Sequence, residues 1–330
     1  MNTEDDRTDG VDTYRLRGRA GRTLDPTTTA VLVIDPVNDF LSEEGAAWDM
    51  TESTVTKHDV IGHLRRLIDG VREHDIPVLY GPMAYTSDDY AGQELHRRTG
   101  INRIMFEQQM FLAGSWGADF HPNLRPREGE IVLHPHKGSD VFETDLREHL
   151  QRLGTTQLVL AGMTANLCVE STGRHAAEHG YDVTFVRDAI GAENLPAYEA
   201  SIRVNFPLIG NAVLDTDDLL SAIGPDRLPR EGDDVYASDQ LKLGGIDEVV
   251  EDDDGPGYVL VKRGIFNRDT YVPLDAVVRV AEGKAFVNIP KLVVGKVPWD
   301  EPPTAASRNA KMGPRPSDIA KLYGSVAPTG

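Results

Sequence analysis

QLVLAGMTANLCVESTGRHAAEHGYDVTFV, residues 157–186, contains two apolar runs separated by a segment with helical spacing. The runs 157–161 and 182–186 are short and rich in Val and Leu, as buried strands are. The segment 167–179 between them has the apolar spacing of a helix. A strand, a helix and a second strand in this order predict parallel strands joined by a right-handed crossover. This stretch therefore indicates an α/β fold.

Further apolar runs of the same kind occur on both sides of this unit, at 30–34, 76–80, 130–133 and 211–214. Segments with helical spacing, such as 60–71 and 145–153, alternate with them. We expect a doubly wound, mostly parallel sheet of six strands with helices on both faces, a three-layer α/β/α domain. Ligands of such sheets bind beyond the carboxyl ends of the strands, so residues directly after each strand are the first candidates for a site.

The pattern changes after about residue 224, where helical spacing is replaced by short strand candidates and Gly- and Asp-containing turns. The candidates at 235–236, 258–261, 270–272 and 285–289 predict a small antiparallel β-barrel-like domain. The expected organisation is a flexible acidic arm at 1–26, the α/β domain at 27–222, a linker at 223–232, the β domain at 233–297 and an extended Pro-containing tail at 298–330.

Composition and charge narrow the classes of partner. The formal net charge is -19, which disfavours nucleic acid and anionic membranes as partners and permits a hypothesis of adaptation to high salt. No apolar run is long enough to span a bilayer, and the acidic start at residues 1–6 differs from a secretion signal. We expect a cytoplasmic homo-oligomer that binds a small molecule. The single cysteine, Cys168, excludes an intramolecular disulfide and a Cys-cluster zinc site.

Three reactive side chains follow three of the predicted strands: Asp35, Lys137 and Cys168. A thiol at a helix N-terminus beside an ammonium is stabilised as the nucleophilic thiolate, and a carboxylate can relay protons. Thr164 or Asn166 can cap that helix. Taken singly, each member has a simpler role, since Cys168 can be a small buried apolar residue, Asp35 can begin a turn and Lys137 can be a solvated loop residue.

Three segments resemble the isochorismatase-like cysteine hydrolases in order and spacing: residues 33–40 (VIDPVNDF), 137–146 (KGSDVFETDL) and 161–169 (AGMTANLCV). The resemblance covers roughly residues 27–222. Residues 233–297 look like a PRC-barrel-type β module.

The resemblance implies an Asp-Lys-Cys catalytic triad. Asp35 would accept and donate protons, Lys137 would stabilise the thiolate, and Cys168 would attack a carbonyl to give a thioester. It also implies a cis peptide between Met163 and Thr164, with the backbone amides of Thr164 and Cys168 forming the oxyanion hole.

The same resemblance implies a pocket lined by aromatic side chains from the neighbouring loops. Phe40 and Trp116 are the candidates, and Asn38, Tyr85 and Asn166 are candidate polar contacts. Large aromatics are more often core residues, so a core position for Phe40 and Trp116 is the alternative.

No metal and no cofactor are expected. The nicotinamidases of the family have an Asp and two His for a metal near the second strand, and residues 81–88 lack that motif. His134 and His136 are able to bind a metal in principle, but two histidines without a third partner are more often hydrogen-bonded loop residues.

The predicted function is therefore cysteine-dependent hydrolysis of a C–N bond in a small amide or ureido compound. Relatives that cleave the vinyl ether of isochorismate lack the cysteine, so that reaction is the alternative. A non-catalytic binding or scaffold protein is the other alternative. The substrate and the role of the β module stay open.

Overall fold

A computed structural model describes residues 23–92, 100–224, 227–251, 257–262, 269–287 and 289–303. The described residues form two compact units, one within Pro26–Ile209 and the other outside that range. Most of the expected arm and most of the expected tail lie outside the described residues, but Thr23 and Leu24 at the end of the expected arm are buried. The predicted domain limits stay a prediction.

The first sheet has six parallel strands in the order β3-β2-β1-β4-β5-β6, as the sequence predicts. Its strands are β1 (Thr29–Ile34), β2 (Val78–Gly81), β3 (Ile131–Val132), β4 (Gln157–Gly162), β5 (Asp182–Ile190) and β6 (Ala212–Leu214). The chain order reverses between β1 and β4, which is the switch point where ligands of such sheets bind.

The two central strands, β1 and β4, are buried at all six of their positions. They pair in parallel from Thr29 opposite Gln157 to Ile34 opposite Gly162. Because both faces are covered, both strands are apolar along nearly their whole length. The last residues of the two strands, Ile34 and Gly162, lie opposite each other. The residues that follow β1 and β4 therefore lie at the same edge of the sheet.

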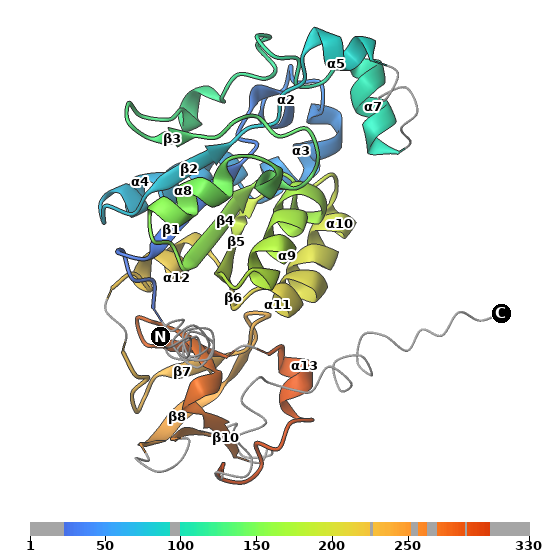
Figure 1. Cartoon of the computed structure of the whole chain (residues 1–330). Coiled ribbons are helices and arrows are strands. Elements are labelled where there is room, and N and C mark those ends of the chain that lie inside the picture. The colour runs from blue at the N-terminus through green and yellow to red at the C-terminus, as the bar shows by residue number, and fades with distance from the viewer. Residues whose placement is uncertain are drawn as a thin grey trace, which may run out of the picture. The chain divides into compact units, whose positions relative to one another are not determined.

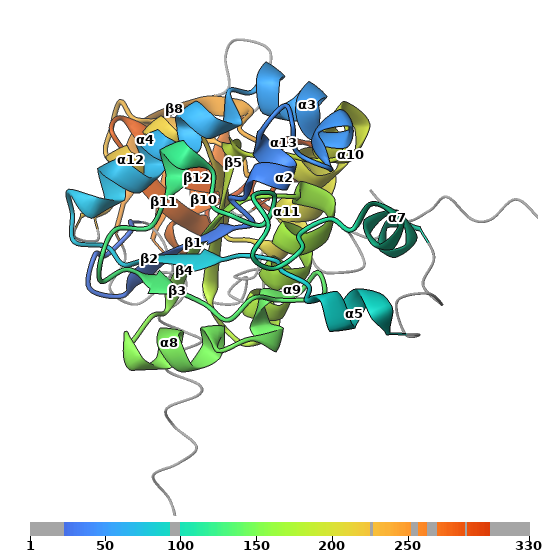
Figure 2. The same cartoon turned by 90° about the horizontal axis from the view of Figure 1, so that it is seen from above.

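Helices cover both faces of this sheet, with α4 on one face and α8 on the opposite face (Figures 1 and 2). The helices are α2 (Asn38–Leu41), α3 (Trp48–Lys57), α4 (Val60–Arg72), α5 (Ser87–Ala91), α7 (Ile101–Gln108), α8 (Leu146–Arg152), α9 (Glu170–Glu178), α10 (Leu195–Ala200), α11 (Phe206–Ile209) and α12 (Thr216–Ser221). The predicted stripe on α4 faces the core, since Val60, Leu64, Leu67, Ile68 and Val71 are buried.

The helix that contains Cys168 begins with a π-helical turn, η3 (Ala165–Val169), and continues as α9. The N-cap of this turn is Thr164, and its side chain makes no capping hydrogen bond. Thr164 thus occupies the predicted cap position, but its side chain does not satisfy a backbone N–H of the turn. Asn166 lies inside the turn, not at its cap.

The second sheet also has six strands, in the order β10-β9-β8-β7-β12-β11, and it curls into a half-barrel. Its strands are β7 (Asp234–Tyr236), β8 (Lys242–Val250), β9 (Tyr258–Lys262), β10 (Thr270–Pro273), β11 (Val277–Ala281) and β12 (Lys284–Val287), followed by the short helix α13 (Lys291–Val294). Neighbouring strands of this sheet are antiparallel except β7 and β12, which are parallel. A core of Val, Ala, Leu and Ile side chains with Trp299 fills its inner face. Membership of the PRC-barrel class stays a prediction.

The sequence patterns do not predict two strands of this sheet, β8 and β11. Gly244, Gly245 and charged residues interrupt β8, which hides its alternation. The charged residue Arg279 lies inside β11, yet its side chain is fully buried.

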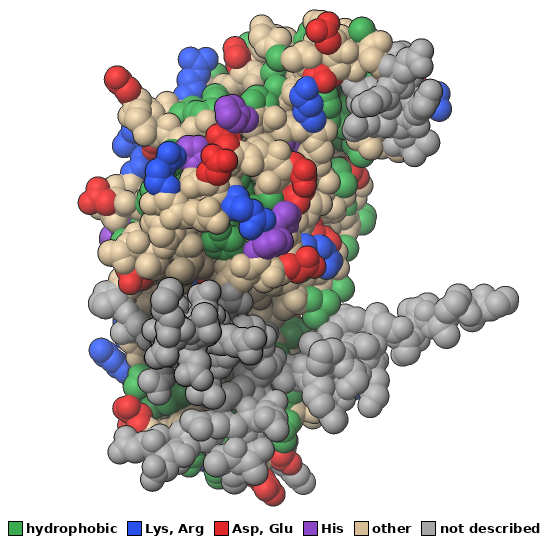
Figure 3. Space-filling view, viewed as in Figure 1, with side chains coloured by type: hydrophobic (Ala, Val, Ile, Leu, Met, Phe, Trp, Pro, Cys, Tyr) green, Lys and Arg blue, Asp and Glu red, His purple; other side chains and the backbone are tan. Residues whose placement is uncertain are grey.

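Charged side chains are mixed on the face shown in Figure 3, where basic groups stand among acidic ones over the described part of the chain. None of the helices in the described ranges is both long and apolar enough to cross a membrane.

Candidate active site

Three side chains meet at the carboxyl edge of the first sheet: Asp35, His136 and Cys168. Asp35 directly follows β1, and its backbone has a left-handed φ of 50° while its N–H donates to the carbonyl of Gly81 at 2.9 Å. Cys168 lies on the turn η3 that follows β4. A carboxylate oxygen of Asp35, a ring nitrogen of His136 and Sγ of Cys168 all lie within 4.8 Å of one another.

His136 is fixed by hydrogen bonds from both ring nitrogens. Its Nε2 lies 2.9 Å from Oδ1 of Asp35, and its Nδ1 lies 2.5 Å from the carbonyl oxygen of Gly138. A carbonyl oxygen only accepts, so Nδ1 carries a proton and Nε2 faces the carboxylate. Both side chains are fully buried.

The pKa of His136 is raised above its ordinary value. Burial works to lower it, but the charge of Asp35 and the hydrogen bonds to Asp35 and to the carbonyls of Gly138 and Gly81 outweigh burial. Asp35 therefore favours the protonated form of the His136 ring.

Lys137 does not belong to this cluster, and its predicted place in the triad is wrong. Its side chain is 51% exposed, and Nζ donates to Oδ1 of Asp89 at 2.7 Å. His136 forms an isolated β-bridge with Met83 and its side chain is fully buried, while the Lys137 side chain is exposed. The structure places the histidine inward and the lysine outward.

Cys168 is a buried thiol, not the preformed thiolate that the sequence suggests. Burial raises the pKa of Cys168 well above its usual range, and the charge of Asp35 and a hydrogen bond with it raise it further. The backbone N–H groups of Thr164 and Cys168 point toward the sulfur and lower the pKa, but less strongly. The thiol therefore needs a base at the moment of attack.

The two predicted oxyanion amides, those of Thr164 and Cys168, both lie beside Sγ. The peptide bond between Met163 and Thr164 is cis, the geometry that the resemblance implies. The side chain of Thr164 is buried, and its Oγ1 finds no hydrogen-bond partner within the described ranges.

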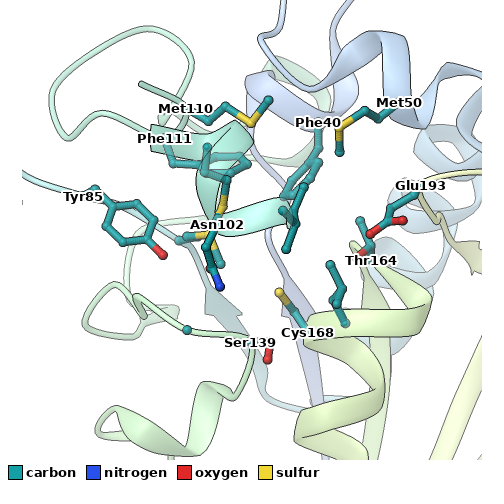
Figure 4. A pocket seen from close by; sticks show the side chains of 15 residues that line it. Phe40, Met50, Tyr85, Asn102, Met110, Phe111, Ser139, Thr164, Cys168 and Glu193 are labelled. Carbon is teal, nitrogen blue, oxygen red and sulfur yellow. The ribbon is translucent and has the colours of Figure 1, made fainter. Parts of the chain in front are cut away.

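A cavity of about 290 Å³ opens beside Cys168 (Figure 4). Its lining is mostly apolar, and the residues are Phe40, Met50, Met83, Tyr85, Ile101, Asn102, Met105, Met110, Phe111, Gly138, Ser139, Thr164, Leu167, Cys168 and Glu193. Pockets for small ligands have this character, with a concave apolar wall and a few polar groups.

Of the five predicted pocket residues, Phe40 and Tyr85 line the cavity. Trp116 does not, since it is 48% exposed. Asn38 is buried and donates from Nδ2 to the carbonyl of Trp116 at 2.8 Å, so it holds a loop. Asn166 also lies outside the lining.

The sequence does not single out the methionines of the wall or Glu193, because they come from helices and loops far apart in the chain. From the sequence, His136 is a candidate metal ligand or a hydrogen-bonded loop residue, not a member of the triad. Asp35, His136 and Cys168 are close enough to hold a metal ion together, so the expected absence of a metal stays a prediction. His134 points outward, with its side chain 84% exposed.

The isochorismatase domain model matches residues 29–218. The chain belongs to the isochorismatase family. With its cysteine beside Asp35 at the strand edge, it is an isochorismatase-family cysteine hydrolase.

Three similar proteins illustrate the relationship. The secreted isochorismatase effector Isc1 of Verticillium dahliae is 34% identical over 99 residues, which are 30% of this chain and 52% of the fungal protein, so the chain spans about half of that relative. The ureidoacrylate amidohydrolase RutB of Methylobacterium radiotolerans is 28% identical over 64% of this chain and 85% of its own length. The crystal structure of a cysteine hydrolase from Pseudomonas syringae has the same fold, with a TM-score of 0.51 at 20% identity over 60% of this chain and 93% of that one.

Proposed function

We propose that this isochorismatase-family protein hydrolyses the C–N bond of a small amide or ureido compound, with Cys168 as the nucleophile. The observation that carries the proposal is the cluster of Asp35, His136 and Cys168 beside a mostly apolar cavity. The similarity to a ureidoacrylate amidohydrolase supports the same class of reaction.

In the first half of the reaction, the carboxylate of Asp35 takes the proton of the Cys168 thiol while Sγ attacks the carbonyl carbon of the substrate. The carbonyl oxygen becomes an oxyanion, and the backbone N–H groups of Thr164 and Cys168 donate to it. The C–N bond then breaks as the nitrogen takes the proton from Asp35. Ammonia leaves, and the acyl group stays on Sγ as a thioester.

In the second half, Asp35 takes a proton from a water molecule, and the resulting hydroxide attacks the thioester carbon. The C–S bond breaks, the acid product forms, and Sγ recovers the proton from Asp35. The carboxylate thus returns to its starting state, and the whole cycle consumes one water.

His136 acts through Asp35 as a positioning residue. Its Nε2–H holds one carboxylate oxygen, Oδ1, which leaves the buried Oδ2 without a hydrogen bond from the histidine. That second oxygen is available to the thiol proton. The positive charge of the imidazolium also balances the buried carboxylate, which would otherwise be costly in an apolar site.

The direct test is a screen of amides and ureido acids for ammonia release, repeated with Cys168→Ala. We expect the substitution to abolish turnover, with a loss on the order of 10³-fold or more, while the circular dichroism spectrum stays unchanged. Mass spectrometry of the quenched enzyme should find the acyl adduct on Cys168. Full activity of Cys168→Ala would contradict the proposal, and release of pyruvate from isochorismate without ammonia from any amide would replace it with vinyl ether hydrolysis.

A further inference from the structure

The cavity beside Cys168 is walled mainly by thioether and phenyl groups. Four methionines, Met50, Met83, Met105 and Met110, and the phenylalanines Phe40 and Phe111 supply most of this surface. Phe40 and Phe111 contact each other, with their ring centroids 4.7 Å apart. Flexible, polarisable thioethers accommodate apolar groups of varied shape. The body of the bound substrate is therefore apolar.

The charge inside the cavity is acidic. Among the described lining residues Glu193 is the only carboxylate, and neither Lys nor Arg is among them. Glu193 is partly exposed, and no side-chain hydrogen bond or ion pair among the described residues involves it. Figure 4 shows Glu193 and Tyr85 on opposite sides of the cavity, with Cys168 between them.

Among the described residues, His136 and Lys137 are each bonded to a carboxylate outside the cavity lining. The imidazolium of His136 is bonded to Asp35 and to the carbonyl of Gly138, and the ammonium of Lys137 is bonded to Asp89 outside the cavity. A substrate carboxylate in the cavity would lose part of its hydration and would meet no Lys or Arg among the described lining residues. The negative charge of Glu193 would repel it. A substrate ammonium or amide N–H would instead find an acceptor there.

We propose that the substrate is an amide with an apolar body and a neutral or positively charged far end, and that Glu193 discriminates against substrates that carry a carboxylate. This inference rests on the proposed function. It sets the protein apart from the ureidoacrylate amidohydrolases, because ureidoacrylate carries a carboxylate.

The test uses three amides of the same length that differ only in the terminal group. Valeramide ends in a methyl group, γ-aminobutyramide in an ammonium and glutaramic acid in a carboxylate. Each is measured as a substrate and as a competitive inhibitor of the best amide from the screen. We expect valeramide and γ-aminobutyramide to bind at least about tenfold more tightly than glutaramic acid, since the carboxylate is desolvated near a like charge.

The variant Glu193→Gln keeps the shape of the side chain and removes its charge. We expect it to reduce the preference for γ-aminobutyramide over glutaramic acid by about tenfold, and Glu193→Lys to reverse that preference. Glu52→Gln removes an exposed carboxylate of α3 that does not line the cavity, and it should leave the preference unchanged.

The outcomes separate the two proposals. Absence of ammonia release from every amide of the screen contradicts the proposed function. Ammonia release together with tighter binding of glutaramic acid, or an unchanged preference in Glu193→Gln, overturns the inference and leaves the proposed function standing.

Discussion

Asp35 lies between an imidazole and a thiol, and each of the two modifies what the carboxylate can do. Asp35 raises the pKa of His136 against the effect of burial, and burial together with the charge of Asp35 raises the pKa of Cys168. A buried carboxylate bonded to a cation through one oxygen retains its second oxygen as a base. At the residue scale, the site thus consists of a neutral thiol, Cys168, beside a carboxylate, Asp35, that can accept its proton. Slow alkylation of Cys168 by mild reagents is consequently expected of the active enzyme, because only the thiolate reacts.

A test of His136 follows from its raised pKa. The His136 ring is protonated at pH values well below its pKa and loses its proton as the pH rises through that pKa. Activity should therefore fall on the alkaline side. His136→Leu should reduce kcat by about 10²-fold or more. His136→Lys should restore part of the activity and move the alkaline limb to higher pH, since a lysine keeps its charge to a pKa of about 10. The measurement is kcat against pH.

Lys137→Met is the matched control for this experiment. The ammonium lies outside the cavity and forms an exposed ion pair with Asp89, whose pKa is lowered to about 2, first by the hydrogen bond from Lys137. We expect unchanged kcat and a stability loss below about 1 kcal/mol. If Lys137→Met lost activity as His136→Leu does, the placement of the histidine in the site would be refuted.

At the scale of elements, the site depends on how closely β4 approaches β1 at their carboxyl ends. Gly162, the last residue of β4, has a φ of +112°, and a Cβ there would lie 2.0 Å from the carbonyl oxygen of Ile34. That oxygen accepts the N–H of Met163, one residue before Thr164. The close contact therefore aligns the segment that precedes Asp35 with the one that leads to Cys168.

Gly162→Ala should disturb this alignment. Backbone strain alone costs roughly 1–3 kcal/mol, and the clash with Ile34 adds to it, so we expect a lower denaturation midpoint together with reduced kcat. Gly129→Ala offers a control, because its φ of +90° imposes comparable strain while nothing lies within 4 Å of the added Cβ. Equal losses in the two variants would show that the contact with Ile34 has no part in the effect.

At the same scale, the ion pair of Arg72 and Glu130 joins α4 to the segment before β3. The guanidinium of Arg72 donates to both carboxylate oxygens of Glu130, at 2.8 and 2.7 Å, and to the hydroxyl of Tyr80 at 3.1 Å. Burial raises the pKa of Glu130, but the bonds from Arg72 outweigh burial and lower it. Such paired, planar contacts are stronger than single ones.

Arg72→Met should cost roughly 1–3 kcal/mol of unfolding free energy at neutral pH. Because the folded pKa of Glu130 is lowered, this stabilisation is present above the unfolded pKa of about 4 and is lost as the pH falls through the folded value. Urea denaturation of the parent protein and of Arg72→Met at several pH values measures the difference between their free energies of unfolding. This difference should become smaller in acid. A difference that is constant with pH would exclude the ion pair as its source.

At the scale of the whole molecule, the net charge of -19 acts against compactness. Salt screens this repulsion, since the Debye length falls from about 10 Å at 0.1 M to about 3 Å at 1 M. We expect the thermal unfolding midpoint to rise by a few degrees over this range of KCl. A thermal unfolding midpoint that does not change with KCl would contradict the hypothesis of adaptation to high salt.

The sequence alone determined the strands of the first sheet and the edge at which Asp35 and Cys168 meet, because these follow from hydrophobic runs and from the direction of parallel strands. Only the tertiary structure decided between His136 and Lys137, which are neighbours in the chain and point to opposite sides. It also decided the protonation of Cys168 and the place of Glu193 in the cavity wall. Burial and the charge of a group distant in sequence control these properties, and neither is visible until the chain is folded.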